Sequence, residues 1–525
     1  MKTSEPIVLN GHNLTPRMVR RVSQGAGVSV DPNAMIEVSA GRAVVERYFA
    51  EGKPAYGLTT GLGARSTEAL SHDAATEFSY KTVRGRVQAL GEPLPVDTVR
   101  ALMVVRLNTL LTGGAGASPA VVETLADALN KGVVPVMPRI GSIGAADLVV
   151  MASLAHALIG EGELLINGVG VPAAEGLTAL GVETLMLAPK DGVVLCNNTA
   201  YSSGAAALAH ERARDVLIAL QGAAALSMEG FGANLSPVLP QALRARPQPG
   251  QVEAGDQLRA LLIDGPLGRP GAARRLQDPV SFRCVAQVHG AAWAALAELD
   301  EELAVDLNTA PDNPVVLIDE GLCISTGNFH LPRLTQTVDG VARALAWCAN
   351  DSVARVHRLM HAPFTGLPML LTSDAPDSAG FGPLLKPLEA LLAEIVHLAN
   401  PVPILGSHNA DGVEDAATFS ALAVEKLNTL LDRLSLLVSI EFLAGAQAID
   451  LRRQASHDTV IGSDFVTTGP APVTRPIEKL YAELRLISPF IHEDRPLGRE
   501  LETVARNLVC SGWFAELLAD DGKGR

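Results

Sequence analysis

Hydrophobic residues recur at every third or fourth position over long stretches of the chain, which is the period of an amphipathic α-helix. In the clearest stretch, from residue 411 to 451, Val424, Leu427, Leu431 and Leu434 share one face of such a helix. The same period runs through residues 98–130, 199–230, 285–307, 333–361 and 382–399. The pattern therefore predicts a mostly α protein built around a bundle of long helices.

Alternation typical of β-strands is short and rare, and its best example is "NPVVLID" at 313–319. We therefore expect few strands, each of a few residues. The polar loops that could carry chemistry begin early in the chain. This suggests an N-terminal active-site domain over residues 1–200, followed by the central helices and C-terminal helices over 201–525.

Composition narrows the class of protein. Of the 525 residues, 48% are hydrophobic and 19% are charged, yet no unbroken apolar run reaches the roughly 20 residues that cross a bilayer. The apolar excess instead predicts a large core and buried subunit interfaces, with no membrane partner. Residues 1–8 show no apolar signal segment, and the five cysteines are scattered without zinc or disulfide spacing, so we expect a cytoplasmic protein. A net charge of −15 argues against a nucleic-acid partner.

Two polar loops lie in the first part of the chain. "YGLTTGLG" (56–63) places Tyr56 beside glycines that allow a loop to move and carry a phenol into a site. The same stretch is also consistent with a plain connector. "LCNNTAYSSG" (195–204) places Asn197 and Asn198 just before a helical segment, where asparagine is also an ordinary N-cap.

Further polar groups follow in the second part. In "QDPVSFRC" (277–284), Arg283 has apolar neighbours and needs a carboxylate partner, from the protein or from a substrate. "NTAPDNPVVL" (308–317) and "STGNFH" (325–330) bring further asparagines and a histidine, and turn chemistry explains each of them alone. In "GSHNADGVEDAAT" (406–418), Asp411 and Glu414 have the spacing of a helix capping box.

Taken together, a tyrosine, an asparagine, an arginine and a carboxylate can bind an amino-acid-like zwitterion and move a proton. Their order resembles that of the histidine and phenylalanine ammonia-lyases. The matching stretches are "YGLTTGLG", "LGEPL" (90–94), "PRIGSIG" (138–144), "GEGE" (160–163), "NNT" (197–199), "QDPVSFRC", "DNPVV" (312–316), "GNFH" (327–330) and "HNAD" (408–411). The resemblance implies a helical homotetramer whose active sites each draw on three subunits. It also implies that Tyr56 is the base, that Arg283 binds the substrate carboxylate, and that Asn197 lies near the reacting centre.

The chain departs from this family where the family makes its electrophile. Members cyclise an internal Ala-Ser-Gly into methylidene-imidazolone, but here Gly144 is followed by Ala145, Ala146 and Asp147. The turn offers no serine to dehydrate and no glycine nitrogen to attack, and it is one residue short. From this turn we expect no methylidene-imidazolone, no other cofactor and no metal. We also expect the Asp147 side chain to cap the helix that follows.

Two other departures concern the substrate. Val280 stands where the family usually has tyrosine, and Arg86 falls at the position that the family uses to select an aromatic ring. Elimination of a quaternary amine needs a base, a carboxylate clamp and a pocket for a cation, and Val280 leaves room for N-methyl groups. We expect either Arg86 or Lys386 to face a ring sulfur of the substrate, and either Asp411 or Glu414 to offset its positive charge. The other residues expected to bind substrate are Val280, Asn313 and Phe329.

These features resemble the ergothionase-like branch of the family and predict a carbon–nitrogen lyase. The expected reaction releases trimethylamine from an imidazole betaine such as ergothioneine and leaves a urocanate-type acrylate. Two alternatives stay open: an ordinary ammonia-lyase or aminomutase acting on histidine or another aromatic amino acid, and a non-catalytic paralogue. The presence of Tyr56, Asn197 and Arg283 together argues against the paralogue, since a decayed site need not keep all three.

Overall fold

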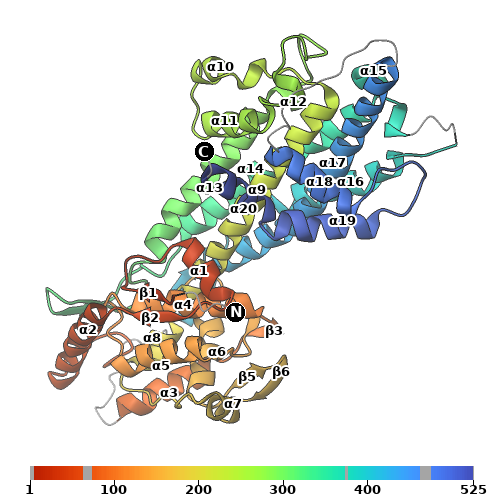
Figure 1. Cartoon of the computed structure of the whole chain (residues 1–525). Helices are drawn as coiled ribbons and strands as arrows, with labels where there is room; N and C mark the ends of the chain where they lie inside the picture. The colour runs from red at the N-terminus through yellow and green to blue at the C-terminus, as the bar shows by residue number, and fades with distance from the viewer. Residues whose placement is uncertain (1–4, 63–73, 373–376, 461–474, 524–525) are drawn as a thin grey trace. The chain divides into compact units, whose positions relative to one another are not determined.

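Helices make up most of the chain, and the strands among the described residues form short two-stranded sheets (Figure 1). This computed structural model describes residues 5–62, 74–372, 377–460 and 475–523. The prediction of a mostly α protein with few short strands is confirmed. The expected strand in "NPVVLID" is β7 (Val315–Leu317), which pairs antiparallel with β8 (Leu322–Ile324).

The chain divides into two compact units. The first unit combines Met1–Glu211, Leu299–Val338 and Pro401–Glu425, and the second combines Arg212–Glu298, Asp339–Asn400 and Lys426–Arg525. This division differs from a single boundary at residue 200, because the chain returns twice to the first unit. Long-range contacts of this kind leave no signal in local composition.

The first unit places short helices and hairpins around a buried core. Helix α4 is buried over most of its length and packs against α1 and α5, while α3, α6 and α8 pack against one another. Its elements are β1 (Ile7–Leu9), α1 (Pro16–Ser23), β2 (Val28–Val30), α2 (Pro32–Ala50), α3 (Ala74–Arg86), β3 (Leu90–Pro93), α4 (Val96–Leu110), α5 (Pro119–Asn130), β4 (Pro138–Ile140), α6 (Leu148–Leu158), β5 (Glu163–Ile166), β6 (Val169–Pro172), α7 (Ala173–Leu180), α8 (Asp191–Cys196), β7, β8, β9 (Gly406–Asn409), η6 (Ala410–Gly412) and β10 (Glu414–Ala416).

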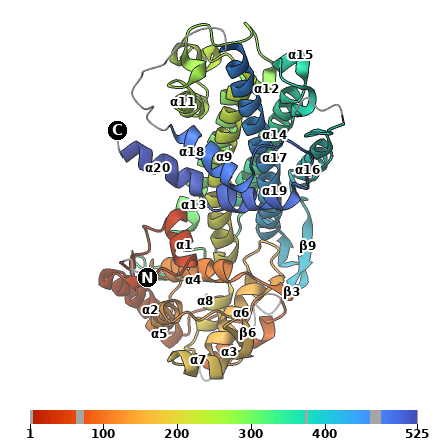
Figure 2. The same cartoon turned by 45° about the vertical axis from the view of Figure 1, so that its right-hand side comes forward.

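Four long helices have residues in both units: α9 (Ala200–Phe231), α13 (Val285–Asp306), α14 (Pro332–Leu359) and α17 (Ser420–Val460). Within the second unit, α9, α14 and α17 run side by side (Figure 2). A buried ion pair joins α14 to α17, with Arg355 Nε 2.6 Å from Glu441 Oε1, and Ser227 on α9 donates to the same carboxylate. The second unit also holds α10 (Pro240–Arg244), α11 (Gln251–Leu262), α12 (Val280–Arg283), α15 (Ala362–Thr365), α16 (Leu385–Leu398), α18 (Pro476–Ile487), α19 (Gly498–Val504) and α20 (Trp513–Lys523).

Helical periodicity placed α9, α13, α14 and α16 within a few residues of their ends. It erred for two other stretches, and it also missed the C-terminal end of α17, which runs nine residues past the expected 451 to Val460. The stretch 98–130 is two helices, α4 and α5, separated by a turn in which Gly113 and Gly116 have positive φ. The helix expected from residue 411 begins at Ser420, and residues 406–416 form the hairpin of β9 and β10 instead. Glycine at 412 and a left-handed Asp411 (φ 55°) suit a tight turn and not a helix.

One helix among the described residues, Ser420–Gln454, is long and apolar enough to cross a membrane by length and composition alone. Its most apolar window is 89% buried inside the structure. Such burial is the ordinary situation of a core helix, so this segment is weak evidence for a membrane span.

Candidate active site

A cavity of about 570 Å³ opens in the first unit, a volume typical of small-molecule sites. Its wall combines a phenol, a guanidinium, two amides and a carboxylate with apolar side chains. The lining residues are Tyr56, Leu62, Thr82, Arg86, Ala145, Leu148, Val193, Asn197, Asn313, Ser325, Phe329, Ala410, Val413 and Glu414. Residues far apart in the sequence thus meet at one place. The expected site residues among them are Tyr56, Arg86, Ala145, Asn197, Asn313, Phe329 and Glu414.

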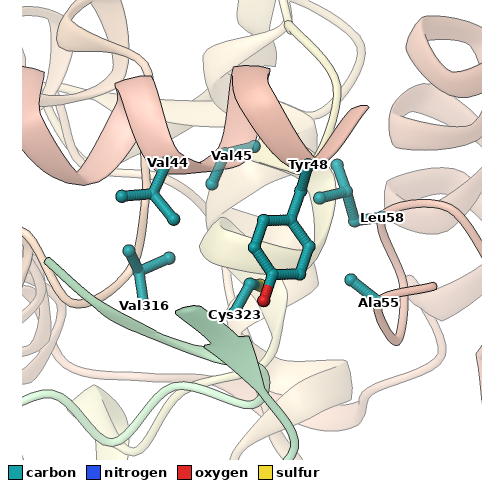
Figure 3. Close-up of a cluster of buried hydrophobic side chains, with 7 residues drawn as sticks. All are labelled: Val44, Val45, Tyr48, Ala55, Leu58, Val316 and Cys323. Carbon is teal, nitrogen blue, oxygen red and sulfur yellow. The ribbon is translucent and has the colours of Figure 1, made fainter. Parts of the chain in front are cut away.

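The Tyr56 loop rests on a cluster of buried side chains (Figure 3). Ala55 and Leu58 flank Tyr56 and pack into this cluster, which also contains Val44, Val45 and Tyr48 of α2 together with Val316 of β7 and Cys323 of β8. Gly57 has a positive φ of 65°, and a Cβ there would lie 2.6 Å from Leu62 Cδ2. The loop is therefore anchored by residues before and after Tyr56, and Tyr56 itself lines the cavity. Gly63, at the end of the motif, lies outside the described residues.

The two asparagines of the cavity are joined to each other. Asn197, the C-cap residue of α8, donates from Nδ2 to the backbone oxygen of Asn313 at 2.9 Å. The Asn313 side-chain oxygen accepts from Ser325 Oγ at 2.9 Å and from Thr326 N at 3.0 Å. Among the described residues, neither Asn197 Oδ1 nor Asn313 Nδ2 has a hydrogen-bond partner, so one acceptor and one donor remain for a bound molecule. Asn198, by contrast, is fully buried and caps α9 through the backbone nitrogen of Ala200.

The turn that begins at Gly144 brings the methyl group of Ala145 to the cavity wall. Gly144 has φ 76°, and a Cβ there would meet Thr418 Oγ1 at 2.1 Å, so only glycine fits. Ala146 adopts a left-handed φ of 60°, which is unfavourable for a residue with a Cβ. Strain of this kind persists where surrounding contacts fix the backbone, and Thr418 supplies one by donating to the Gly144 carbonyl at 2.9 Å.

Asp147 holds this turn against α9. Its carboxylate accepts from Ser142 Oγ at 2.6 Å, from Ser202 Oγ at 2.7 Å and from Ser202 N at 2.8 Å. Burial raises the pKa of this carboxyl, and the hydrogen bonds from Ser142 and Ser202 oppose the rise. The expectation that Asp147 caps the following helix was wrong: it occupies the N-cap position of α6, but its side chain makes no capping bond there and binds the first turn of α9 instead.

The acidic residues expected near the leaving group separate in the hairpin of β9 and β10. Glu414 is half-buried and lines the cavity, together with Ala410 and Val413. Asp411 sits at the tip of the hairpin and is exposed, and it is not among the described residues that line the cavity. Asp411 and Glu414, whose spacing resembled a helix capping box, therefore belong to a hairpin. Glu414 lines the cavity and Asp411 is exposed to solvent.

The remaining expected residues lie in the second unit. Arg283 ends α12, and its Nε is buried without a hydrogen-bond partner among the described residues. Val280, at the start of α12, is 56% exposed, and Lys386 on α16 is also exposed. Helix α12 thus carries the exposed side chain of Val280 at its first residue and the guanidinium of Arg283 at its last. No group of His, Cys, Asp and Glu side chains suited to a metal ion occurs within the described ranges.

Comparison with known proteins assigns the chain to a family. The model for aromatic amino acid lyases matches residues 14–485. The chain belongs to the aromatic amino acid lyase family. A histidine ammonia-lyase of Anaeromyxobacter dehalogenans (strain 2CP-C) is 33% identical over 521 residues, covering 97% of this chain and 99% of the relative. One from Myxococcus xanthus (strain DK1622) is 32% identical over 98% of each chain. The chain is accordingly an enzyme of the carbon–nitrogen lyase type.

Solved structures agree with this assignment. Ergothionase from Treponema denticola, described as an ergothioneine-degrading enzyme in complex with desmethyl-ergothioneine sulfonic acid, superposes with a TM-score of 0.89 at 28% identity, covering 97% of this chain and 99% of that one. Histidine ammonia-lyase from Trypanosoma cruzi superposes with a TM-score of 0.86 at 28% identity, covering 98% and 95%. The expected resemblance to both branches is confirmed.

Family membership overturns the prediction of an enzyme without the methylidene-imidazolone. The histidine ammonia-lyases that match almost the whole chain belong to a family that uses this group, so the comparisons do not support a cofactor-free enzyme. The turn itself does not fit the usual precursor: Ala145 and Ala146 carry no hydroxyl, and the backbone nitrogen of Asp147 donates to the Asn198 carbonyl at 2.8 Å.

Proposed function

We propose that the chain catalyses the α,β-elimination of trimethylamine from an imidazole betaine of the ergothioneine type, giving a urocanate-type acrylate. The observation that carries the proposal is the pairing of Tyr56 and Glu414 in one cavity, beside the small side chain of Ala145. A carboxylate attracts a quaternary ammonium group, which cannot donate an N–H hydrogen bond and packs against apolar surface. A phenol in the same cavity supplies a candidate base.

The proton and electron movements of this elimination balance as follows. The Tyr56 phenolate takes the β-proton, the electrons of that C–H bond form the new C=C bond, and the C–N bond breaks with its electron pair leaving on nitrogen. Trimethylamine departs as a neutral molecule and needs no proton. The Asn197 oxygen and the Asn313 amide nitrogen bind polar parts of the substrate, and Phe329 offers a face to its ring.

The substrate carboxylate needs a cation, and we propose that Arg283 supplies it from another copy of the chain in a cytoplasmic homotetramer. Support comes from the unpartnered, buried Nε of Arg283 and from the planar fork of a guanidinium, which matches a carboxylate. Arg86 lines the cavity, and its Nη1 donates to the Thr82 carbonyl at 3.3 Å. We place the remaining donors of Arg86 toward the ring sulfur of a thioimidazole.

A second candidate is an ordinary histidine ammonia-lyase. It is favoured by the names of relatives that are 30–33% identical over almost the whole chain. Both candidates place an imidazole ring and a carboxylate in the cavity, and they differ in the amine that leaves. The charge and methylation of that amine therefore separate them experimentally.

Recognition of the quaternary ammonium predicts a selective effect at Glu414. Replacing Glu414 with glutamine keeps the shape and removes the charge, so the KM for a trimethylated betaine should rise roughly 5- to 30-fold, the equivalent of about 1–2 kcal/mol for a half-buried charge contact. Steady-state kinetics of trimethylamine release measures this change. Asp411→Asn is the matched control, since Asp411 is exposed and asparagine tolerates its left-handed φ. Equal effects of the two substitutions would contradict the assignment of Glu414.

A further inference from the structure

A buried ion pair lies next to the asparagine pair of the cavity. Arg106 on α4 and Asp312 are 0% and 3% exposed in their side chains, and Arg106 Nη2 is 2.7 Å from Asp312 Oδ1. A second contact joins Arg106 Nη1 to Asp312 Oδ2 at 3.3 Å. Asp312 immediately precedes Asn313, so the ion pair fixes the backbone that carries one of the two asparagines.

The Arg106 guanidinium also contacts α8, the helix that precedes Asn197. Arg106 Nη2 donates to the backbone oxygen of Val194 at 2.6 Å, three residues before Asn197 on α8. A second basic side chain also holds this segment: the buried Nζ of Lys190 donates to the Pro314 carbonyl at 3.2 Å, on the other side of Asn313. One side chain of α4 therefore ties together the two segments whose spacing sets the hydrogen bond between Asn197 and Asn313.

We propose that Arg106 is a positioning residue of the lyase reaction. By holding Val194 and Asp312 at once, it sets the distance between Asn197 and Asn313 and thereby directs the two amide atoms left for the substrate. The proposal rests on the lyase function and on the place of the two asparagines in its site, but not on which amine leaves.

The Arg106→Lys substitution tests this role, because an ammonium is a point charge and cannot hold a carboxylate and a distant carbonyl in the fixed fork of a guanidinium. Arg100 provides the matched control. It lies on the same helix and is 7% exposed, but its guanidinium donates to the backbone carbonyls of Val22 and Leu129, outside the cavity lining. Arg100→Lys thus loses buried hydrogen bonds to backbone carbonyls, as Arg106→Lys does at Val194, without touching either asparagine segment.

The experiment is a double-mutant cycle of Arg106→Lys with Asn197→Ala, measured as kcat on the substrate that the wild-type enzyme turns over best. We expect Arg106→Lys to lower kcat by roughly 10-fold or more in the wild-type background, yet less than about 3-fold once Asn197 is alanine. Arg100→Lys should lower kcat less than about 3-fold in both backgrounds, even if it lowers the melting temperature as much as Arg106→Lys does. Asp312→Asn replaces Arg106→Lys if that variant does not fold.

Crystal structures of the two lysine variants complete the test and do not depend on turnover. The bond from Asn197 Nδ2 to Asn313 O should be lost or lengthened in Arg106→Lys and kept in Arg100→Lys. An unchanged asparagine pair in Arg106→Lys, or equal and additive losses of kcat for both lysine variants, would overturn the positioning role. A wild-type enzyme that releases no amine would instead overturn the proposed function, and the structures would still decide the role of Arg106.

Discussion

Replacing Tyr56 with phenylalanine should lower turnover by roughly 10²–10⁴-fold, the usual contribution of one general base. The substitution removes only the hydroxyl, so the ring still fills its place in the cavity wall, and Ala55 and Leu58 still pack in the buried cluster. A free phenol ordinarily ionises near pH 10. The base therefore needs nearby donors or cations while it works, and Arg86 lines the same cavity. Single-turnover release of the acrylate product measures the chemical step directly.

Tyr48→Phe is the matched control for this substitution. Tyr48 is 7% exposed and belongs to the cluster beneath the Tyr56 loop (Figure 3), but it is not among the described residues that line the cavity. Losing its hydroxyl should leave turnover within about 3-fold of wild type. Wild-type turnover in Tyr56→Phe, or an equal loss in both variants, would remove Tyr56 from the role of base.

Replacing Arg283 with lysine should cost about 2–4 kcal/mol of transition-state stabilisation, or roughly a 30- to 1000-fold loss in kcat/KM. Lysine keeps the positive charge but loses the two parallel N–H bonds that a guanidinium makes to a carboxylate. The loss should be smaller for a substrate analogue whose carboxylate is replaced by an amide, because that analogue offers no anion to clamp. Steady-state kinetics with both compounds measures the difference.

Arg275→Lys is the control for the effect of replacing an arginine elsewhere in the second unit. The Arg275 guanidinium lies over the ring of Phe364 and donates to the Pro363 carbonyl at 2.8 Å, so its contacts are internal. That variant should keep kcat/KM within about 3-fold of wild type. Unaltered kcat/KM in Arg283→Lys would show that the substrate carboxylate is bound elsewhere.

Sequence periodicity predicted the long helices because helical contacts are local. The three- and four-residue spacing of Leu427, Leu431 and Leu434 places them on one buried face of α17. The start of that helix was missed because the preceding stretch folds as a hairpin, a tertiary choice that glycine and a left-handed Asp411 permit. Motif order also picked out residues such as Tyr56, Asn197 and Glu414 that line the cavity, whereas it gave no sign that Arg283 lies in the other unit. The roles of these residues stay predictions.

Contacts between distant segments escaped prediction. Asp147 has the position of a cap for α6, yet its carboxylate binds Ser202, 55 residues away. The pairing of Arg106 with Asp312 spans 206 residues. The sequence does carry one usable signal for Arg106: a charged residue inside the apolar stretch "ALMVVRLNTLL" needs a buried partner. The identity of that partner becomes visible only in the fold.

The cofactor prediction failed for a different reason. It was drawn from Ala145, Ala146 and Asp147 alone, where the chain lacks the family's serine and glycine, whereas similarity over nearly all 525 residues places the chain among relatives that use the group. The three residues of the turn show only which groups the turn itself contains. Similarity over nearly the whole chain is the stronger evidence on whether the enzyme uses the cofactor.

Side-by-side assay of the amine released tests the proposed function most directly. The wild-type enzyme is given a trimethylated imidazole betaine and, separately, free histidine, phenylalanine and tyrosine at matched concentrations, and trimethylamine and ammonia are quantified together with the acrylate product. We expect trimethylamine from the betaine and little or no ammonia from the amino acids. Ammonia from histidine with no trimethylamine from the betaine would contradict the proposal and identify an ordinary histidine ammonia-lyase, and release of neither amine would contradict both candidate reactions.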